Sequence, residues 1–167
     1  PPVNAINQKV RSGLMTAFQT VDQDNNIRAV VLKCAGRTFM AGVDIKEVDE
    51  PIADPGYHEV FRVIESCSKP VIAAMHGTAL GAGLEAALAC HYRCAVKNAR
   101  MGLPEVSLGI IPGAGGSQRL PRLIGAKAAL EFILGVVPIS ATEAYKIGIL
   151  DRVIEEDLME GTLEYVG

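Results

Sequence analysis

The sequence predicts an α/β fold. Short apolar segments typical of buried strands, such as residues 70–75, alternate with segments in which apolar residues recur at helical spacing. Gly-rich turns join many of these short segments, which favours a layered or coiled stack over one long open sheet. With 167 residues, of which 49% are apolar, the chain has the length of one domain with a sizeable core.

The first half of the chain is predicted to contain two helices and two strands. Apolar residues from Val10 to Val21 recur on one face of a helix, and Val60, Phe61 and Ile64 do the same further along. Continuous apolar runs predict buried strands on either side of the second helix. The predicted elements are helix 7–22, strand 28–34, loop 35–54, helix 57–67 and strand 70–75.

The second half is predicted to contain short helices entered through glycine or serine. An apolar helix opens after Gly81 and Gly83, and Ser140 followed by Glu143 has the spacing of a capping box. Residues 103–111 alternate turn signals with apolar residues. The predicted elements are helix 84–90, strand 91–96, helices 118–123, 126–134 and 141–147, and strand 150–154.

Composition excludes several classes of function. The net charge of −3 argues against a nucleic-acid surface, and no apolar stretch approaches the length of a membrane span. The chain begins at Pro1 without a Met or a signal-like leader, so we expect it to be a piece of a longer protein.

The four cysteines predict buried, reduced thiols of an intracellular protein. A partial metal-binding motif is formed by the spacing of Cys90, His91 and Cys94, but a second Cys/His pair at ligand spacing is missing from the sequence. We therefore expect no metal site.

Glu85 and Glu105 are the candidate catalytic residues. They lie twenty positions apart in matching settings rich in glycine, proline and apolar residues. At a helix start the dipole favours the charged carboxylate while apolar neighbours disfavour it, and opposed effects of this kind prepare a carboxylate for acid/base work. A glutamate at a helix start is also a common surface residue, so these settings leave a structural and a catalytic role about equally supported.

The glycines around Glu85 allow two interpretations. Residues 81–86 match the dinucleotide fingerprint G-x-G-x-x-G/A weakly, because five residues separate the predicted strand end from Gly81. Residues 113–118 lack the Gly-Lys-Ser/Thr ending of a P-loop. The alternative is that free N–H groups at the helix start, with others from loop 39–46, hold a developing oxyanion.

Several motifs, in the right order, resemble those of the enoyl-CoA hydratase/isomerase (crotonase) superfamily. Residues 89–93 are similar to the hydratase part of multifunctional fatty-acid β-oxidation enzymes. The matching stretches are residues 4–7, 39–47, 69–77, 80–85, 102–105, 108–122 and 144–150.

The resemblance implies a spiral of repeated ββα units whose loops bind acyl-CoA. Residues 1–167 would be a crotonase-like catalytic core, with an extra strand before Pro1 and most of a C-terminal helical region after Gly167 absent from the chain. One departure concerns the site itself, because Ala82 stands where the family often has glycine. Its N–H donor remains, but the added methyl group narrows the approach.

Residue by residue, the resemblance implies a complete hydratase site. The N–H groups of Val43 and Ala82 would form the oxyanion hole, and Glu85 and Glu105 would hold one water between them. The loop residues Ala41, Gly42, Asp44, Ile45 and Lys46 would bind the CoA part of the substrate, with Lys46 available to a phosphate.

The activity implied is enoyl-CoA hydratase, syn addition of water to trans-2-enoyl-CoA. Alternatives are a Δ3,Δ2-enoyl-CoA isomerase, a non-catalytic acyl-CoA-binding fragment and an RNA-associated relative, against which the acidic balance speaks. No cofactor is expected, since CoA belongs to the substrate, and neither nucleic acid nor membrane is an expected partner. We expect a homotrimer or hexamer, or fusion to a 3-hydroxyacyl-CoA dehydrogenase domain, in a peroxisome or bacterial cytoplasm in preference to a mitochondrion.

Overall fold

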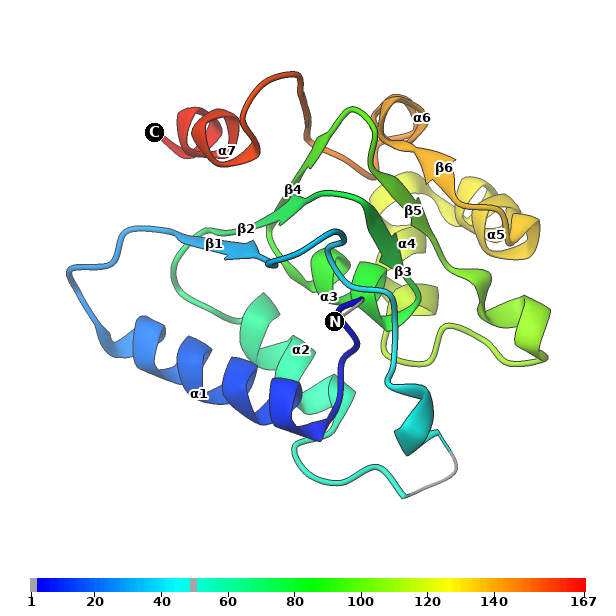
Figure 1. Cartoon of the computed structure of the whole chain (residues 1–167), viewed down its shortest axis with the longest axis horizontal. Helices are drawn as coiled ribbons and strands as arrows, with labels where there is room; N and C mark the ends of the chain where they lie inside the picture. The colour runs from blue at the N-terminus through cyan, green and yellow to red at the C-terminus, as the bar shows by residue number, and fades with distance from the viewer. Residues whose placement is uncertain (1–2, 49–50) are drawn as a thin grey trace.

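The structure, a computed structural model, describes residues 3–48 and 51–167 as an α/β arrangement of short elements (Figure 1). The elements are α1 (Gln8–Gln23), β1 (Val30–Lys33), the 3-10 helix η1 (Ile45–Glu47), α2 (Tyr57–Glu65), β2 (Val71–Met75), β3 (Thr78–Leu80), α3 (Ala82–Ala89), β4 (Tyr92–Val96), β5 (Arg100–Gly102), the 3-10 helix η2 (Pro104–Leu108), α4 (Gly116–Ile124), α5 (Ala126–Gly135), β6 (Ile139–Ser140), α6 (Ala141–Lys146), β7 (Arg152–Ile154) and α7 (Leu158–Val166).

The strands form two sheets. The larger has the order β1-β2-β4-β7, and each of its neighbouring pairs is parallel. The smaller has the order β3-β5-β6, with β3 and β5 parallel and β5 and β6 antiparallel. Each parallel pair requires a crossover, and the helices between the strands supply several of them. The chain therefore passes repeatedly from one sheet to the other.

Helices cover both faces of the larger sheet (Figure 1). Helix α7 packs on β2, β4 and β7 at one face. Helix α3 packs on β4 at the opposite face, and α2 and then α1 lie beyond it on that same side. Every residue of β2 is buried, as expected for an inner strand of a covered parallel sheet. Ala73 and Met75 join the main core, and Ile72 and Ala74 join the smaller cluster under α7.

The predicted helices and strands are largely confirmed, with ends that agree or are shifted by one or two residues. The Ser140–Glu143 capping box is present, with both reciprocal hydrogen bonds. Strand β1, predicted to be buried, is only half-buried because it lies at the edge of its sheet. Strands β3, β5 and β6 and helix α7 were not predicted. The 3-10 helix η1 lies within the predicted loop 35–54, of which residues 49–50 lie outside the described residues.

The inner face of α1 differs from its prediction. Val10 is 37% exposed, whereas Arg11, one position on, is 1% exposed and lies on the buried side with Phe18. The apolar pattern was wrong here because a charged residue with several hydrogen-bond partners occupies a core position.

The cysteines are free thiols in the structure. Cys67, Cys90 and Cys94 are buried as predicted, while Cys34 is half-buried. Within the described ranges, the helices are all too short or too polar to cross a membrane.

Candidate active site

The start of α3 is the centre of the candidate site. Gly81 connects β3 directly to α3 with φ of 51°, a conformation that favours glycine, and the helix begins at Ala82, two residues earlier than predicted. The five residues that the sequence analysis placed between strand and glycine are therefore mostly strand β3. Glu85 lies in the first turn of α3, as predicted.

The loop around Met40 lies directly against this helix start. Met40 forms a parallel bridge with Ala79, and the Leu80 N–H donates to the Met40 carbonyl at 3.0 Å. A side chain on Gly83 would overlap the backbone of Met40, so only glycine permits this approach. The sequence thereby brings two backbone segments, 40–43 and 80–83, side by side.

Each of these segments carries a predicted oxyanion donor. Among the described residues, no acceptor receives a hydrogen bond from the Val43 or the Ala82 N–H. A Cβ on Gly81 would lie 3.9 Å from the Gly42 Cα, so the two donor segments are close together. Two unpaired N–H groups at a helix start and in the adjoining loop are available to a ligand oxygen.

Glu85 is buried and firmly held. Its side chain is 2% exposed, and its Oε1 accepts hydrogen bonds from the Ala114 N–H at 2.9 Å and the Gly116 N–H at 2.7 Å. Burial raises the pKa of this carboxyl, while the two N–H donors and the nearby Arg119 oppose that rise. These donors were not predicted, although the glycine-rich run 113–116 is a sequence signal for a close backbone approach.

Glu105 has a different environment. It belongs to η2, and its Oε2 is buried without a hydrogen-bond partner among the described residues. Its Oε1 lies 3.1 Å from the position of a Cβ on Gly81, which places the carboxyl beside the start of α3. Burial raises the pKa of Glu105, and the neighbouring charge of Glu85 raises it further.

The charges of the two carboxyl groups therefore interact, but the two groups differ in the hydrogen-bond donors around them. The N–H donors around Glu85 favour its charged form, whereas the side chain of Glu105 is bordered by a glycine and keeps one oxygen unpaired. Pairs of titratable groups whose environments separate their pKa values can divide acid and base roles between them.

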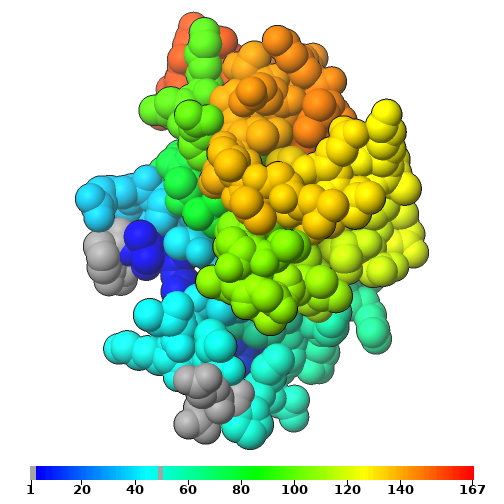
Figure 2. Space-filling view, turned by 90° about the vertical axis from the view of Figure 1, so that its right-hand side faces the viewer, coloured from blue at the N-terminus to red at the C-terminus, as the bar shows by residue number. Residues whose placement is uncertain are grey.

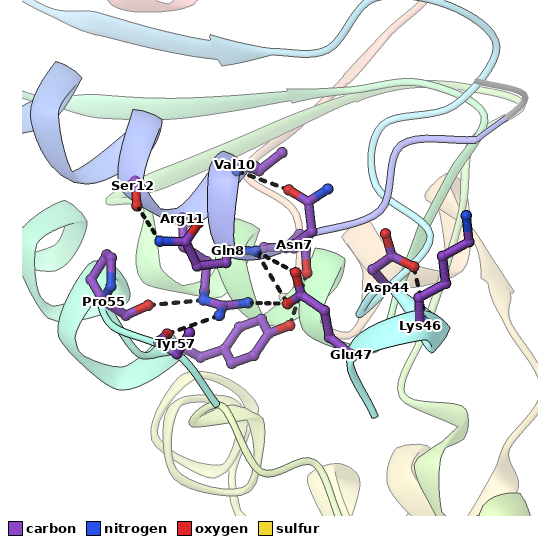
Figure 3. Close-up of polar contacts among 12 residues, drawn as sticks. Asn7, Gln8, Val10, Arg11, Ser12, Asp44, Lys46, Glu47, Pro55 and Tyr57 are labelled. Carbon is purple, nitrogen blue, oxygen red and sulfur yellow. Dashed lines mark hydrogen bonds and ion pairs between the residues drawn. The ribbon is translucent and has the colours of Figure 1, made fainter. Parts of the chain in front are cut away.

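The loop of predicted substrate-binding residues follows the Val43 donor. Gly42 is buried, Ala41 and Asp44 are half-buried, and Val43, Ile45 and Lys46 are exposed. The Asp44 carboxylate accepts a hydrogen bond from the Lys46 N–H and so caps η1 (Figure 3).

A buried arginine fixes the far end of this loop. Arg11 donates to the Glu47 carboxylate at 3.0 Å and to the Pro55 and Ala53 carbonyls, and its guanidinium lies 4.5 Å from the centre of the Tyr57 ring (Figure 3). The sequence signal for this cluster was a charged residue in an apolar helix face. It holds η1 against α1, and the Val43 donor is two residues before η1.

His91, part of the partial metal-binding motif noted in the sequence, has a structural role instead. The His91 Nδ1 accepts from the Val71 N–H at 2.9 Å, and its Nε2 lies 3.1 Å from the Glu65 carbonyl. Both ring nitrogens are therefore engaged in joining α2, β2 and the start of β4.

A hollow elsewhere in the molecule is not a better candidate. It has a volume of about 740 Å³ between the larger sheet and α7, and Arg28, Tyr92 and Tyr165 are among its lining residues. None of the predicted site residues lines it. The Glu105 segment instead reaches the surface between the 40–55 loop and α5 (Figure 2).

Comparisons with known proteins identify the family. The family model described as Enoyl-CoA hydratase/isomerase matches residues 1–166. The chain is 47% identical over 165 residues to a peroxisomal bifunctional enzyme of Danio rerio, covering 99% of this chain and 23% of that protein. It is 43% identical over 157 residues to a probable enoyl-CoA hydratase of Bacillus subtilis, covering 90% of this chain and 61% of that protein.

Solved structures agree with this result. The enoyl-CoA hydratase from Bacillus anthracis superimposes with a TM-score of 0.92 at 37% sequence identity, covering 99% of this chain and 67% of that chain. The predicted crotonase-like α/β fold is thus confirmed. The chain belongs to the enoyl-CoA hydratase/isomerase family, close to the hydratase part of multifunctional β-oxidation enzymes.

Proposed function

We propose that the chain is the catalytic core of an enoyl-CoA hydratase, which adds water to a trans-2-enoyl-CoA to give a 3-hydroxyacyl-CoA. The observation that carries this proposal is the pair Glu85 and Glu105, two unlike carboxyl groups at the start of α3 beside two unpaired N–H groups. Bifunctional and hydratase relatives support the same reaction class.

In this proposal the thioester oxygen accepts hydrogen bonds from the Val43 and Ala82 N–H groups. These donors would stabilise the negative charge that develops when hydroxide adds to the conjugated double bond. Loss of one donor of this kind typically costs about 3 kcal/mol of transition-state stabilisation. CoA would run along residues 41–46, with Lys46 exposed for a phosphate.

The different settings suggest how the carboxyl groups share the work. Glu85, whose charged form is stabilised by two N–H donors, would act as the base that removes a proton from water. Glu105, whose pKa is raised by burial and by Glu85, would act as the acid that protonates the α carbon. The water oxygen bonds to the β carbon as Glu85 takes its proton, the thioester oxygen carries the resulting negative charge, and the α carbon then takes the proton of Glu105. Proton exchange with solvent afterwards returns Glu85 to its charged form and Glu105 to its protonated form.

The surroundings of Glu105 suit an acyl chain. Leu108, Ile110 and Ile111 follow it closely and are 76%, 57% and 69% exposed. Exposed apolar side chains grouped beside polar catalytic groups are typical of sites for apolar substrates. The substrate class proposed is therefore an acyl-CoA, without a further cofactor.

The test is hydration of crotonyl-CoA by the full-length gene product. Glu85→Gln and Glu105→Gln should each lower kcat by about 10²-fold or more, because each removes one proton-transfer group. Calorimetry with acetoacetyl-CoA should show unchanged affinity in both variants. Glu131→Gln, on the exposed part of α5, is the matched control. Undiminished turnover in Glu105→Gln would exclude the two-carboxylate mechanism.

A second candidate activity is the Δ3,Δ2-enoyl-CoA isomerase reaction. It is favoured by the unpaired Oε2 of Glu105, because one free carboxylate can move a proton between two carbons of the substrate. In that case Glu85→Gln would retain turnover of a trans-3-enoyl-CoA while Glu105→Gln would lose it. Tight binding of acetoacetyl-CoA with neither activity would indicate a non-catalytic acyl-CoA-binding protein.

The context proposed for the whole protein follows from its relatives. The chain spans 23% of the bifunctional enzyme of Danio rerio and 61% of the Bacillus subtilis protein. We propose either fusion to a 3-hydroxyacyl-CoA dehydrogenase domain in a peroxisome, or a homotrimer or hexamer in a bacterial cytoplasm. Size measurement of the full-length gene product distinguishes these two arrangements.

A further inference from the structure

The backbone that holds Glu85 is itself held by an arginine. Residues 114–116 donate two N–H groups to the Glu85 carboxylate, and Gly115 between them has φ of 112°. Arg119 donates to the Ala114 carbonyl at 3.3 Å, and its guanidinium fills the space that a side chain on Gly115 would need. The arginine thus packs on the outer side of the same turn whose inner side binds Glu85.

Arg119 is in turn oriented by Glu65 at the end of α2. Its Nη2 and Nε donate to the two Glu65 oxygens at 2.8 and 3.3 Å, a forked arrangement that fixes the plane of the guanidinium. The Arg119 side chain is 16% exposed, against 53% for Glu65. The pair therefore places a positive charge at the partly buried end, toward Glu85, and a negative charge at the solvent end.

We propose that Arg119, oriented by Glu65, is a positioning residue that keeps Glu85 ionised for catalysis. The inference rests on the proposed function for its catalytic meaning, but its electrostatic part can be tested without turnover. Arg119 does not touch the proposed reacting atoms; it acts by fixing the 114–116 turn and by its charge.

Other charges around α3 do not supply this effect. Burial raises the pKa of Glu85, the Gly116 and Ala114 N–H groups oppose that rise, and among the described residues Arg119 is the charged group that also lowers it. Glu105, from η2, is an acid and adds negative charge. Cys90, at the opposite end of α3, has its pKa raised to about 12 and is neutral, and Arg93 of β4 is paired with Asp151.

The first measurement is the pKa of the Glu85 carboxyl by carbon-13 NMR, with the signal assigned by its loss in Glu85→Gln. Arg119→Gln should raise this pKa further above its ordinary value, because an opposite charge nearby is removed. Arg119→Lys should raise it less, since the charge remains. Glu65→Gln should leave it unchanged or lower it, because a compensating negative charge is lost while the arginine stays.

The second measurement is the pH profile of crotonyl-CoA hydration, whose acidic limb should move in the same direction in each variant. Arg122→Gln is the matched control, since Arg122 lies on the exposed side of α4 and, in the part of the chain that the structure describes, its side chain bonds within that helix alone. An unchanged Glu85 pKa in Arg119→Gln, or an equal rise in Glu65→Gln or Arg122→Gln, would overturn the proposal. Absence of hydration in the wild type with the expected NMR shifts would instead contradict the proposed function alone.

Discussion

Glu85 and Glu105 meet at the start of one helix, yet the molecule treats them differently. Glu85 is almost fully buried and accepts two backbone hydrogen bonds, whereas Glu105 is half-buried and keeps an oxygen without a partner. Both have a raised pKa because of burial. The same residue type is thus integrated into the fold in one place and left available for a ligand in the other.

The largest expected contrast is in stability after removal of each carboxyl. Glu85→Leu leaves the Ala114 and Gly116 N–H groups buried without an acceptor, and each orphaned donor costs about 1–3 kcal/mol. Glu105→Leu removes a carboxyl whose Oε2 has no hydrogen-bond partner among the described residues and whose backbone donor is its own N–H, so its effect should stay below about 1 kcal/mol. Urea denaturation of the two variants measures this difference, and equal losses would show that the two settings are alike.

An intermediate contrast concerns the glycines that border the carboxyls. Gly81→Ala forces a side chain onto a backbone with φ of 51° and ψ of −128°, and should cost about 1–3 kcal/mol. Gly116→Ala has no such backbone strain, but its Cβ would lie 3.0 Å from the Glu85 Oε1. We expect Gly116→Ala to lose more turnover than stability, and Gly81→Ala to lose both. Paired denaturation and hydration assays check this, and a stable Gly81→Ala variant would contradict it.

The smallest contrast is the pH dependence of stability. A carboxyl whose folded pKa lies above its ordinary value of 4.5 stabilises the folded state fully below that value, and this stabilisation is lost as pH rises through the folded pKa. Glu105→Gln, which cannot ionise, should therefore melt about 1–3 °C above the wild type near pH 7, and at the same temperature as the wild type near pH 4.

Glu85→Gln should show a smaller gain, since the N–H donors already compensate the charge there. Scanning calorimetry at the two pH values supplies the comparison. A gain in Glu105→Gln that is the same at both pH values would mean that ionisation is not its cause.

Local patterns predicted much of the fold. Strand β2 and helix α3 are continuous apolar runs, and the Ser140 cap depends on residues only three positions apart, so no distant information was needed. Strands β3, β5 and β6 have two or three residues each and exist only because they pair with one another. A single sequence carries no local signal for such pairs.

The candidate site, like the fold, has features that local sequence predicts and features that depend on distant residues. Glu85 and Glu105 could be chosen from their glycine-rich surroundings. The difference in their hydrogen bonding could not be predicted, because the donors to Glu85 come from a turn about thirty positions further along the chain. The Arg11 cluster was also missed, since its partners lie about forty positions away and include backbone carbonyls that any residue supplies.

The contact between Met40 and the start of α3 has a consequence for folding kinetics. The bridge from Met40 to Ala79 closes a loop of about forty residues, and the absence of a side chain at Gly83 permits the close backbone contact. Contacts of such sequence separation form late, after the entropy of loop closure has been overcome. The two unpaired N–H groups are therefore expected to come together only after this long-range contact has formed, so a chain without it should have no affinity for a thioester oxygen.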